Sequence, residues 1–248
     1  MSTPPSLSKS RVDKAGRNIC KWLSDVERDS DITIPATDVQ IDVPESIVED
    51  FAVANAWRMS HAAPLSGVSG SLRSFSATTG VDVQIAQRHK RLRRILFKLA
   101  RPGSTMRLSA MQDIGGCRVI FRSQDDLAKY RRHLESRWRE KIVRVDDYIE
   151  RPKDTGYRAV HVVTRRQGRA IEVQLRVDWM HDWADSVERF GRQHGVELKA
   201  GFGDDTILQY LRVVADINAV AVDGMPPPDD LLQELQVLTS QLEARSSQ

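Results

Sequence analysis

The chain has 248 residues, of which 40% are hydrophobic and 29% are charged, so it can build a sizeable core and is not disordered throughout. Its two cysteines exclude a disulfide scaffold and a zinc site of four thiolates, and its first residues lack the apolar run of a secretory signal. No apolar stretch approaches the roughly 18 residues of a membrane helix. We therefore expect a cytoplasmic protein that has no membrane segment.

The charges are distributed unevenly along the chain. Residues 84–122 carry ten basic residues and a single acidic one, Asp113, which gives this stretch a net charge of +9. Residues 204–248 carry eight acidic and two basic residues, which gives a net charge of −6. This asymmetry predicts a site for a polyanion in the middle of the chain, with the acidic end docked near it.

Helical periodicity dominates the first third of the chain. Apolar residues at helical spacing predict helices over 15–28 and 46–61, with a loop over 29–44 between them. The small residues at 67–71 predict a second connecting segment between helices. The basic stretch from Val81 to Leu99 predicts one long helix whose apolar side faces inward.

The period then changes from that of helices to that of strands. Four segments have the strand pattern: 117–121, 141–149, 158–165 and 169–177. Further helices are expected after Ser123, which has the character of a cap, and over 178–192, 205–222 and 229–244. The order of these elements predicts an α+β fold in which helices flank a small mixed β-sheet.

Two segments place carboxylates where they could act on a ligand. In IEVQLRV, residues 171–177, strand alternation puts Glu172, Gln174 and Arg176 on one face. This pattern fits either an ordinary half-solvated strand or a strand that carries a functional site. In MQDIGGCRVIF, residues 111–121, Asp113 precedes a Gly-Gly turn that lets the backbone approach a ligand. Asp113 could pair with the surrounding cations or could hold Mg²⁺ together with phosphate oxygens.

A third segment, YIERPKDTGYRAVH at residues 148–161, combines an aromatic residue with basic ones. Tyr157 could stack on a nucleobase or could simply pack, and the basic residues could hold phosphates. Together the three segments offer carboxylates, cations and an aromatic ring, which are the parts that phosphoryl transfer requires.

These motifs, with the RxK…K pattern at 88–98 and the continuation of the last strand into DWMHDWAD, resemble the synthetase domain of the RelA/SpoT family in order and spacing. The resemblance covers roughly residues 85–190. It implies a sheet of nucleotidyltransferase type in a core over 81–195, with a helical N-terminal extension over 1–80 and an acidic helical pair over 196–248. The stretch WRMSH…PL at 57–65 also resembles the toxic small alarmone synthetases of toxin–antitoxin systems.

The resemblance implies transfer of the β,γ-pyrophosphate of ATP to a 3′-hydroxyl. By position, Asp113 and Glu172 would hold Mg²⁺, and Glu172 would also activate the acceptor hydroxyl. Four basic residues would bind ATP: Arg88 and Arg118 on either side of the adenine, and Lys90 and Lys98 on the phosphates. Four residues would bind the acceptor: Tyr157, stacked on its base, with Lys153, His161 and Gln174 nearby.

The identity of the acceptor stays open at this point. The family's usual acceptor is GDP or GTP, whereas toxic members modify the 3′ end of tRNA or make adenosine analogues. Seven arginines exceed what a mononucleotide needs, which modestly favours tRNA, with an antitoxin protein as a partner. They are Arg91, Arg93, Arg101, Arg151, Arg165, Arg166 and Arg169. Homo-oligomerisation is also open.

The chain departs from the family pattern at three positions. Arg94, Ala159 and Val177 stand where the family has Ser, Ser and Thr. These changes leave a second class of function open, a catalytically silent protein that binds nucleotide or RNA. Retention of Asp113 and Glu172 favours an active enzyme, because a binding protein has no need of a general base.

Overall fold

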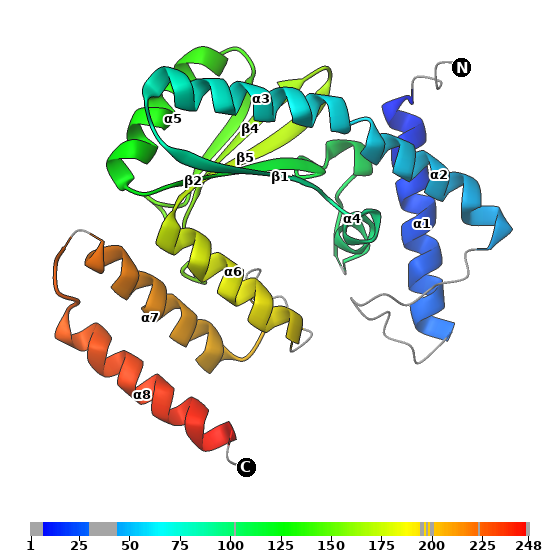
Figure 1. Ribbon diagram of the computed structural model, residues 1–248. Helices are drawn as coiled ribbons and strands as arrows, with labels where there is room; N and C mark the ends of the chain where they lie inside the picture. The colour runs from blue at the N-terminus through cyan, green and yellow to red at the C-terminus, as the bar shows by residue number, and fades with distance from the viewer. Residues whose placement is uncertain are drawn as a thin grey trace.

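A five-stranded mixed sheet with helices packed around it forms the centre of the computed structural model (Figure 1). The structure describes residues 7–29, 44–101, 103–193, 196, 198, 201–222 and 224–246. The predicted loop over 29–44 falls almost entirely outside these residues. The α+β class predicted from the sequence is confirmed.

The strands are β1 (Val83–His89), β2 (Gly115–Phe121), β3 (Ile142–Asp147), β4 (Val160–Arg166) and β5 (Arg169–Val177). Their order in the sheet is β1-β2-β5-β4-β3. Strands β2 and β5 pair in parallel, and every other neighbouring pair is antiparallel. The parallel pair places Gly116 of β2 opposite Glu172 of β5, at the centre of the sheet.

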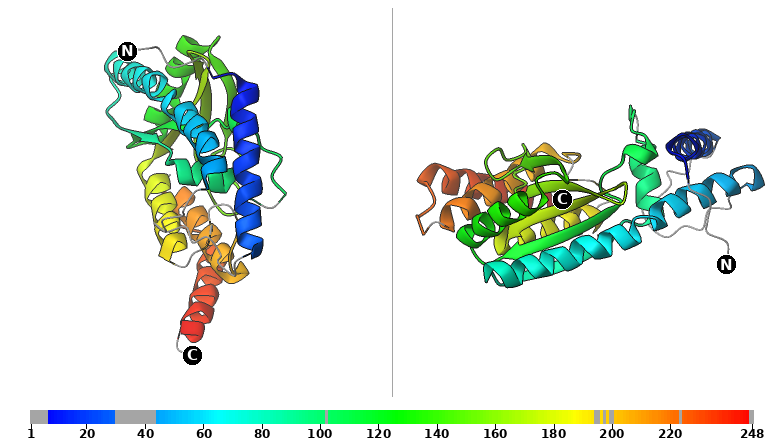
Figure 2. Two further views of the ribbon diagram at one scale, coloured as in Figure 1. Left: turned by 90° about the vertical axis from the view of Figure 1, so that its right-hand side faces the viewer. Right: turned by 90° about the horizontal axis from the view of Figure 1, so that it is seen from above.

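One face of the sheet is covered by α3 (Ala62–Thr79) and α5 (Gln124–Trp138) (Figure 2). Val68 and Leu72 of α3 and Tyr130 of α5 join the buried side chains of the strands in a single core. The side-chain oxygen of Ser123 accepts a hydrogen bond from the backbone of Asp126, which confirms the predicted cap of α5.

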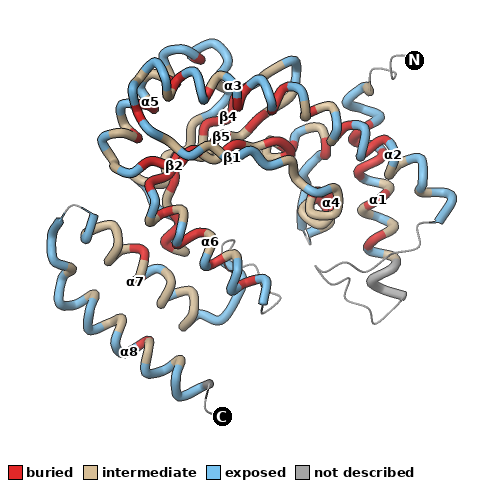
Figure 3. Tube along the Cα trace, in the orientation of Figure 1, coloured by how far each residue is buried: buried red, intermediate tan, exposed pale blue. Residues whose placement is uncertain are grey.

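Two further cores lie at the ends of the sheet. Helices α1 (Lys9–Asp29), α2 (Glu45–Met59) and α4 (Leu92–Leu99) form one of them, with Ile19, Trp57 and Ile95 among its buried residues. Helix α6 (Asp178–Gln193) and helix α7 (Asp205–Ala221) form the other. Helix α8 (Asp229–Ser246) lies along α7 and is mostly exposed (Figure 3).

The long helix predicted over 81–99 is wrong in its first half. Residues 83–89 form the edge strand β1, and the helix begins only at Leu92. Val81, Val83 and Ile85 alternate with polar residues, and Val83 pairs with Phe121 of β2. The segment forms a strand and not a helix because pairing with β2 satisfies the hydrogen bonds of its backbone. In a strand, its alternating apolar side chains also reach the core.

The connecting segment predicted over 67–71 is also wrong, because α3 continues through these residues. A Cβ atom at Gly67 or Gly70 would meet no other atom within 4 Å, so these glycines lie on an open side of the helix. Val68 and Ser69 are buried on the other side. Packing of this apolar face holds the helix together despite its small residues.

The acidic end of the chain docks on α6 and on the segment before β4. The indole nitrogen of Trp183 donates a hydrogen bond to the carbonyl oxygen of Leu211, at 3.0 Å. Arg158 pairs with Asp216 of α7 at 2.6 Å.

The predicted domain boundaries stay a prediction, although α3, which falls within the predicted extension, packs on the sheet. None of the described helices is both long and apolar enough to cross a membrane.

Candidate active site

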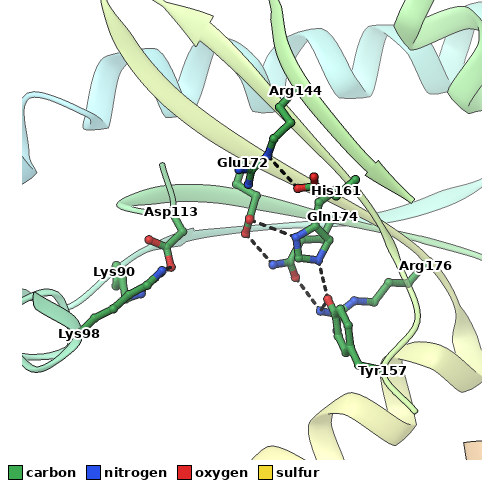
Figure 4. Close-up of polar contacts among 10 residues, drawn as sticks. Lys90, Lys98, Asp113, Arg144, Tyr157, His161, Glu172, Gln174 and Arg176 are labelled. Carbon is green, nitrogen blue, oxygen red and sulfur yellow. Dashed lines mark hydrogen bonds and ion pairs between the residues drawn. The ribbon is translucent and has the colours of Figure 1, made fainter. Parts of the chain in front are cut away.

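Asp113 and two lysines form the first half of the candidate site (Figure 4). Asp113 directly precedes β2, Lys90 follows β1, and Lys98 lies on α4. The Nζ atoms of Lys90 and Lys98 lie 2.6 Å and 2.8 Å from Oδ2 of Asp113. The antiparallel pairing of β1 with β2 brings these residues together, since His89 pairs with Gly115.

The lysines keep Asp113 ionised. Burial alone would raise the pKa of its carboxyl group, but the two ammonium groups outweigh burial and lower the pKa. Burial also lowers the pKa of Lys90, and Asp113 opposes that shift. The second carboxylate oxygen, Oδ1, is buried and accepts no hydrogen bond from the residues that the structure describes.

The free oxygen of Asp113 fits the coordination preference of magnesium. Within the described part of the chain, no group of three or more His, Cys, Asp or Glu residues could hold a metal ion. Mg²⁺ binds readily through one or two carboxylates when phosphates and water complete its shell. Asp113 is therefore the residue best placed to hold such an ion, and Glu172 is the second candidate.

Glu172 forms the second half of the site, on the face of β5 opposite the core that α3 and α5 cover, where its side chain is 16% exposed. Its Oε1 atom lies 3.1 Å from Nδ1 of His161, and its Oε2 atom accepts a hydrogen bond from Gln174 at 2.7 Å. Strand β4 carries His161 opposite Gln174. Burial would raise the pKa of Glu172, but the bonds from His161 and Gln174 lower it, so the carboxylate is charged at neutral pH.

The network continues through Tyr157 to Arg176. The Tyr157 hydroxyl lies 2.6 Å from Nε2 of His161 and accepts a hydrogen bond from Arg176 at 2.7 Å. Tyr157 is 1% exposed, so a base could stack on its ring only after neighbouring groups moved. Tyr148 is half-buried beside it, and the ammonium of Lys153 lies 4.6 Å from the Tyr148 ring centroid.

Arg88 and Arg118 face α6 rather than the lysines. Arg118 pairs with Asp185 at 3.1 Å. Glu188 lies 3.9 Å from Arg88 through Oε1 and 3.8 Å from Arg118 through Oε2, so one carboxylate bridges the two cations.

The two halves belong to one site. Gly116, three residues after Asp113, pairs with Glu172, and the negative charge of Asp113 acts on the pKa of Glu172. A Cβ atom at Gly115 would lie 2.8 Å from Cδ1 of Ile171, so this glycine serves the close approach of β2 to β5. By their register, five of the ten predicted site residues lie on one face of the sheet: Arg88, Arg118, His161, Glu172 and Gln174. The other five lie in the segments that follow β1 or precede β2 and β4.

Sequence reasoning gave no role to Arg176 or to Glu188. Alternation along β5 already places Arg176 on the face of Glu172 and Gln174, and this was the available signal. Glu188 follows Asp185 by three residues, a spacing that places both on one helix face. Neither signal reveals the partner, because the pairing arises from the packing of α6 against β2.

The family comparison matches residues 87–197 with the region found in RelA and SpoT proteins. Residues 87–197, here called the RelA/SpoT segment, are thus similar to this family over less than half of the chain. Strands β2 to β5 and the residues of both halves of the site lie within the RelA/SpoT segment.

Curated relatives are similar over the same part. The probable chloroplastic GTP diphosphokinase RSH3 of Oryza sativa subsp. japonica is 34% identical over 98 residues, which are 39% of this chain and 14% of the relative. The GTP pyrophosphokinase of Escherichia coli K12 is 26% identical over 117 residues, or 47% of this chain and 16% of the relative. The chain thus spans only a small part of the length of the RelA/SpoT relatives it matches.

Solved structures share the fold over a longer stretch. Small alarmone synthetase 1 of Bacillus subtilis superposes with a TM-score of 0.55 at 18% identity, over 77% of this chain and 97% of that one. A GTP pyrophosphokinase family protein of Streptococcus pneumoniae gives a TM-score of 0.54 at 24% identity, over 68% and 89% of the two chains. The RelA/SpoT segment therefore sits in a fold of small alarmone synthetase type. The resemblance of residues 57–65 to the toxic branch stays a prediction.

Proposed function

We propose that the chain is a pyrophosphokinase that transfers the β,γ-pyrophosphate of ATP to the 3′-hydroxyl of a guanosine nucleotide. The observation that carries this proposal is the joint presence of two separately held carboxylates beside the parallel pair of β2 and β5. Asp113 is held by cations, whereas Glu172 is held by a histidine and an amide. Two carboxylates in such different surroundings can take different roles.

The reaction breaks the bond between the β-phosphorus of ATP and the oxygen that bridges its α- and β-phosphates. We infer attack of the acceptor 3′-oxygen on the β-phosphorus, so the new bond joins that oxygen to the β-phosphorus and the bridging oxygen leaves with AMP. The hydroxyl proton is released in the process. Glu172 is ionised and accepts hydrogen bonds already, so it can accept the one donated by the hydroxyl.

The ATP side of the site is cationic. Lys90 and Lys98 can bind the phosphates, and Arg88 and Arg118 can hold the adenine between two guanidinium groups. Phosphate binding would draw the lysines from Asp113 and free its carboxylate. Mg²⁺, when bound, would neutralise charge that develops on the transferred group.

The acceptor side contains the predicted residues, with a difference in how they are arranged. His161, Gln174 and Lys153 surround Tyr157 and Tyr148. Because Tyr148 is the more exposed ring, it can receive a base without the rearrangement that Tyr157 requires. Stacking on Tyr157 stays a prediction for the complex with acceptor.

Two of the seven arginines that favoured a tRNA acceptor are engaged in packing. The guanidinium of Arg166 lies 4.5 Å from the Trp138 ring centroid, and that of Arg169 lies 4.0 Å from the Trp57 ring centroid. Arg165 is exposed. Because these two cations are engaged, fewer are presented to a long polyanion than the sequence suggests, and we therefore propose a mononucleotide acceptor in preference to tRNA.

The proposal is tested by incubating the protein with [γ-³²P]ATP, Mg²⁺ and one of four acceptors: GDP, GTP, AMP or total tRNA. Label on GDP or GTP is the expected result. Label on tRNA alone, or on AMP alone, would replace the acceptor while keeping the chemistry. Binding of ATP with no label on any acceptor would instead support the silent binding protein.

A further inference from the structure

The C-terminal end of α2 and the two residues after it contact Lys90 of the site and Arg169 at the start of β5, although they lie outside the RelA/SpoT segment. This stretch, Trp57–His61, was noted in the sequence for its WRMSH motif, and the reaction itself gives it no role. His61 is 1% exposed and Trp57 is 3% exposed, so these two residues anchor the stretch in the interior, whereas Met59 between them is exposed. Two of its residues, Arg58 and Ser60, hold other parts of the site.

Arg58 forms a reciprocal pair of hydrogen bonds with the end of β1. Its Nε atom donates to the carbonyl oxygen of Lys90 at 2.6 Å, and its own carbonyl oxygen lies 2.8 Å from Nε2 of His89. The backbone nitrogen of Lys90 donates to the carbonyl oxygen of Ile114 at 2.8 Å. The peptide of Lys90 is therefore fixed on one side by α2 and on the other by the strand entry beside Asp113.

The same stretch also holds the start of β5. Arg169, the first residue of β5, lies over the Trp57 ring and donates a hydrogen bond from Nε to Ser60 at 2.7 Å. Glu172 follows three residues later on the same strand. Trp57–His61 thus spans from the Lys90 side of the site to the Glu172 side.

The side chain of Lys90 needs such an anchor. Its ammonium shares Oδ2 of Asp113 with Lys98, so two like charges converge on one oxygen, and burial disfavours the charged form of Lys90. A fixed backbone lowers the entropy cost of holding the side chain in this position.

We propose that Arg58 is a positioning residue, which sets the place of the Lys90 ammonium for the phosphates of a nucleoside triphosphate by holding the Lys90 carbonyl. This inference rests on the proposed function. It assigns Arg58 no contact with the substrate and makes its effect pass through Lys90 alone.

The test compares Arg58→Ala and Arg58→Gln with Arg11→Ala, alone and combined with Lys90→Ala. Arg11 pairs with Glu49 between α1 and α2, in the same helical layer but without a bond to the site, so it is the matched control. We would measure the KM of ATP and of the acceptor, kcat, the Kd of a non-hydrolysable ATP analogue with Mg²⁺, and the melting temperature.

Both Arg58 variants should raise the KM of ATP and the Kd of the analogue by about tenfold, the effect of losing one well-placed hydrogen bond to a charged site. The KM of the acceptor should stay unchanged. In the Lys90→Ala background, Arg58→Ala should have no further effect on either constant. Full additivity in that background, or an equal loss for ATP and acceptor, would overturn the proposal.

The analogue Kd separates this inference from the proposed function. If the parent protein binds the analogue but transfers nothing, the proposed function fails and the Kd values still decide the role of Arg58. If the parent protein does not bind the analogue, both are overturned. A melting temperature that falls for Arg58→Ala and not for Arg11→Ala, with unchanged Kd, would make Arg58 merely structural.

Discussion

His161 lies between Glu172 and Tyr157 and contacts each through a different ring nitrogen, Nδ1 at 3.1 Å and Nε2 at 2.6 Å. An ionised carboxylate only accepts hydrogen bonds, so Nδ1 carries the hydrogen that points at Glu172. In the neutral ring, Nε2 then accepts the hydroxyl hydrogen of Tyr157, whose oxygen accepts from Arg176. The chain of bonds fixes both the ring and the carboxylate.

From this arrangement we expect His161→Gln to lower kcat by about ten- to a hundredfold, because a buried carboxylate that loses a partner costs about 1–3 kcal/mol. Tyr157→Phe removes only the outer bond and should cost less. The Kd of an ATP analogue should not change in either variant. A Tyr157→Phe loss that exceeds the His161→Gln loss would contradict the order of the chain.

Glu188 offers a second test, on the opposite side of the site. Glu188→Gln removes the charge that bridges Arg88 and Arg118, so we expect the KM of ATP to rise by about two- to fivefold, a small effect because the pairs are long and partly exposed. Glu135→Gln, which disturbs an ion pair with Arg131 on α5, is the control. Equal KM values for the two variants would show that Glu188 does not position the arginines.

From the burial of His61 we expect the free energy of unfolding to depend on pH. Burial is the largest cause that lowers the pKa of His61, from 6.5 to about 4, against the opposing hydrogen bond to Trp57. Below pH 6.5 the unfolded chain takes up a proton that the folded chain refuses until about pH 4. Stability therefore falls as the pH drops through this window, by about 3 kcal/mol in all.

Urea denaturation at several pH values measures this dependence. In His61→Gln the position no longer titrates, so the free energy of unfolding should vary less between pH 6.5 and 4 than in the parent. Parallel curves for the parent and the variant would show that other groups cause the acid sensitivity.

Gly156 tests the docking of α7. Its φ of 83° is left-handed, and a Cβ atom there would lie 2.8 Å from Cβ of Ala215 and 2.9 Å from Cα of Arg212. Gly168 has a φ of 73°, but its Cβ would meet nothing within 4 Å. We expect Gly168→Ala to cost about 1 kcal/mol of stability from strain alone, and Gly156→Ala to cost at least about 2 kcal/mol more from overpacking. Equal melting temperatures for the two variants would mean that α7 does not pack closely against the turn at Gly156.

The sequence was sufficient for the parts of the fold that depend on local patterns. Strand β5, the cap at Ser123 and the helix over 178–192 follow from alternation, capping chemistry and helical periodicity. Strand β1 was missed because the basic stretch that follows it fits a helix and seemed to include it, and only the pairing with β2 decides between strand and helix for residues 83–89. Local patterns cannot show such pairing.

In the candidate site, too, local motifs were sufficient to select some residues but not to reveal their contacts. Asp113 and Glu172 could be selected from their motifs, since a lone acidic residue among bases and an alternating strand are visible in one dimension. The two lysines on a single oxygen of Asp113, the burial of Tyr157 and the bridge by Glu188 depend on how β1, β4 and α6 pack. These contacts join residues that are distant along the chain, so no local pattern contains them.

Pyrophosphate transfer with Glu172 as the acceptor of the hydroxyl proton is the central claim, and a product analysis with [α-³²P]ATP and GDP tests it most directly. The protein should release labelled AMP in equal amount to the guanosine product that gains two phosphates, and Glu172→Gln should bind the ATP analogue normally while releasing no AMP. Release of labelled ADP, or AMP release by Glu172→Gln at the parental rate, would contradict the account.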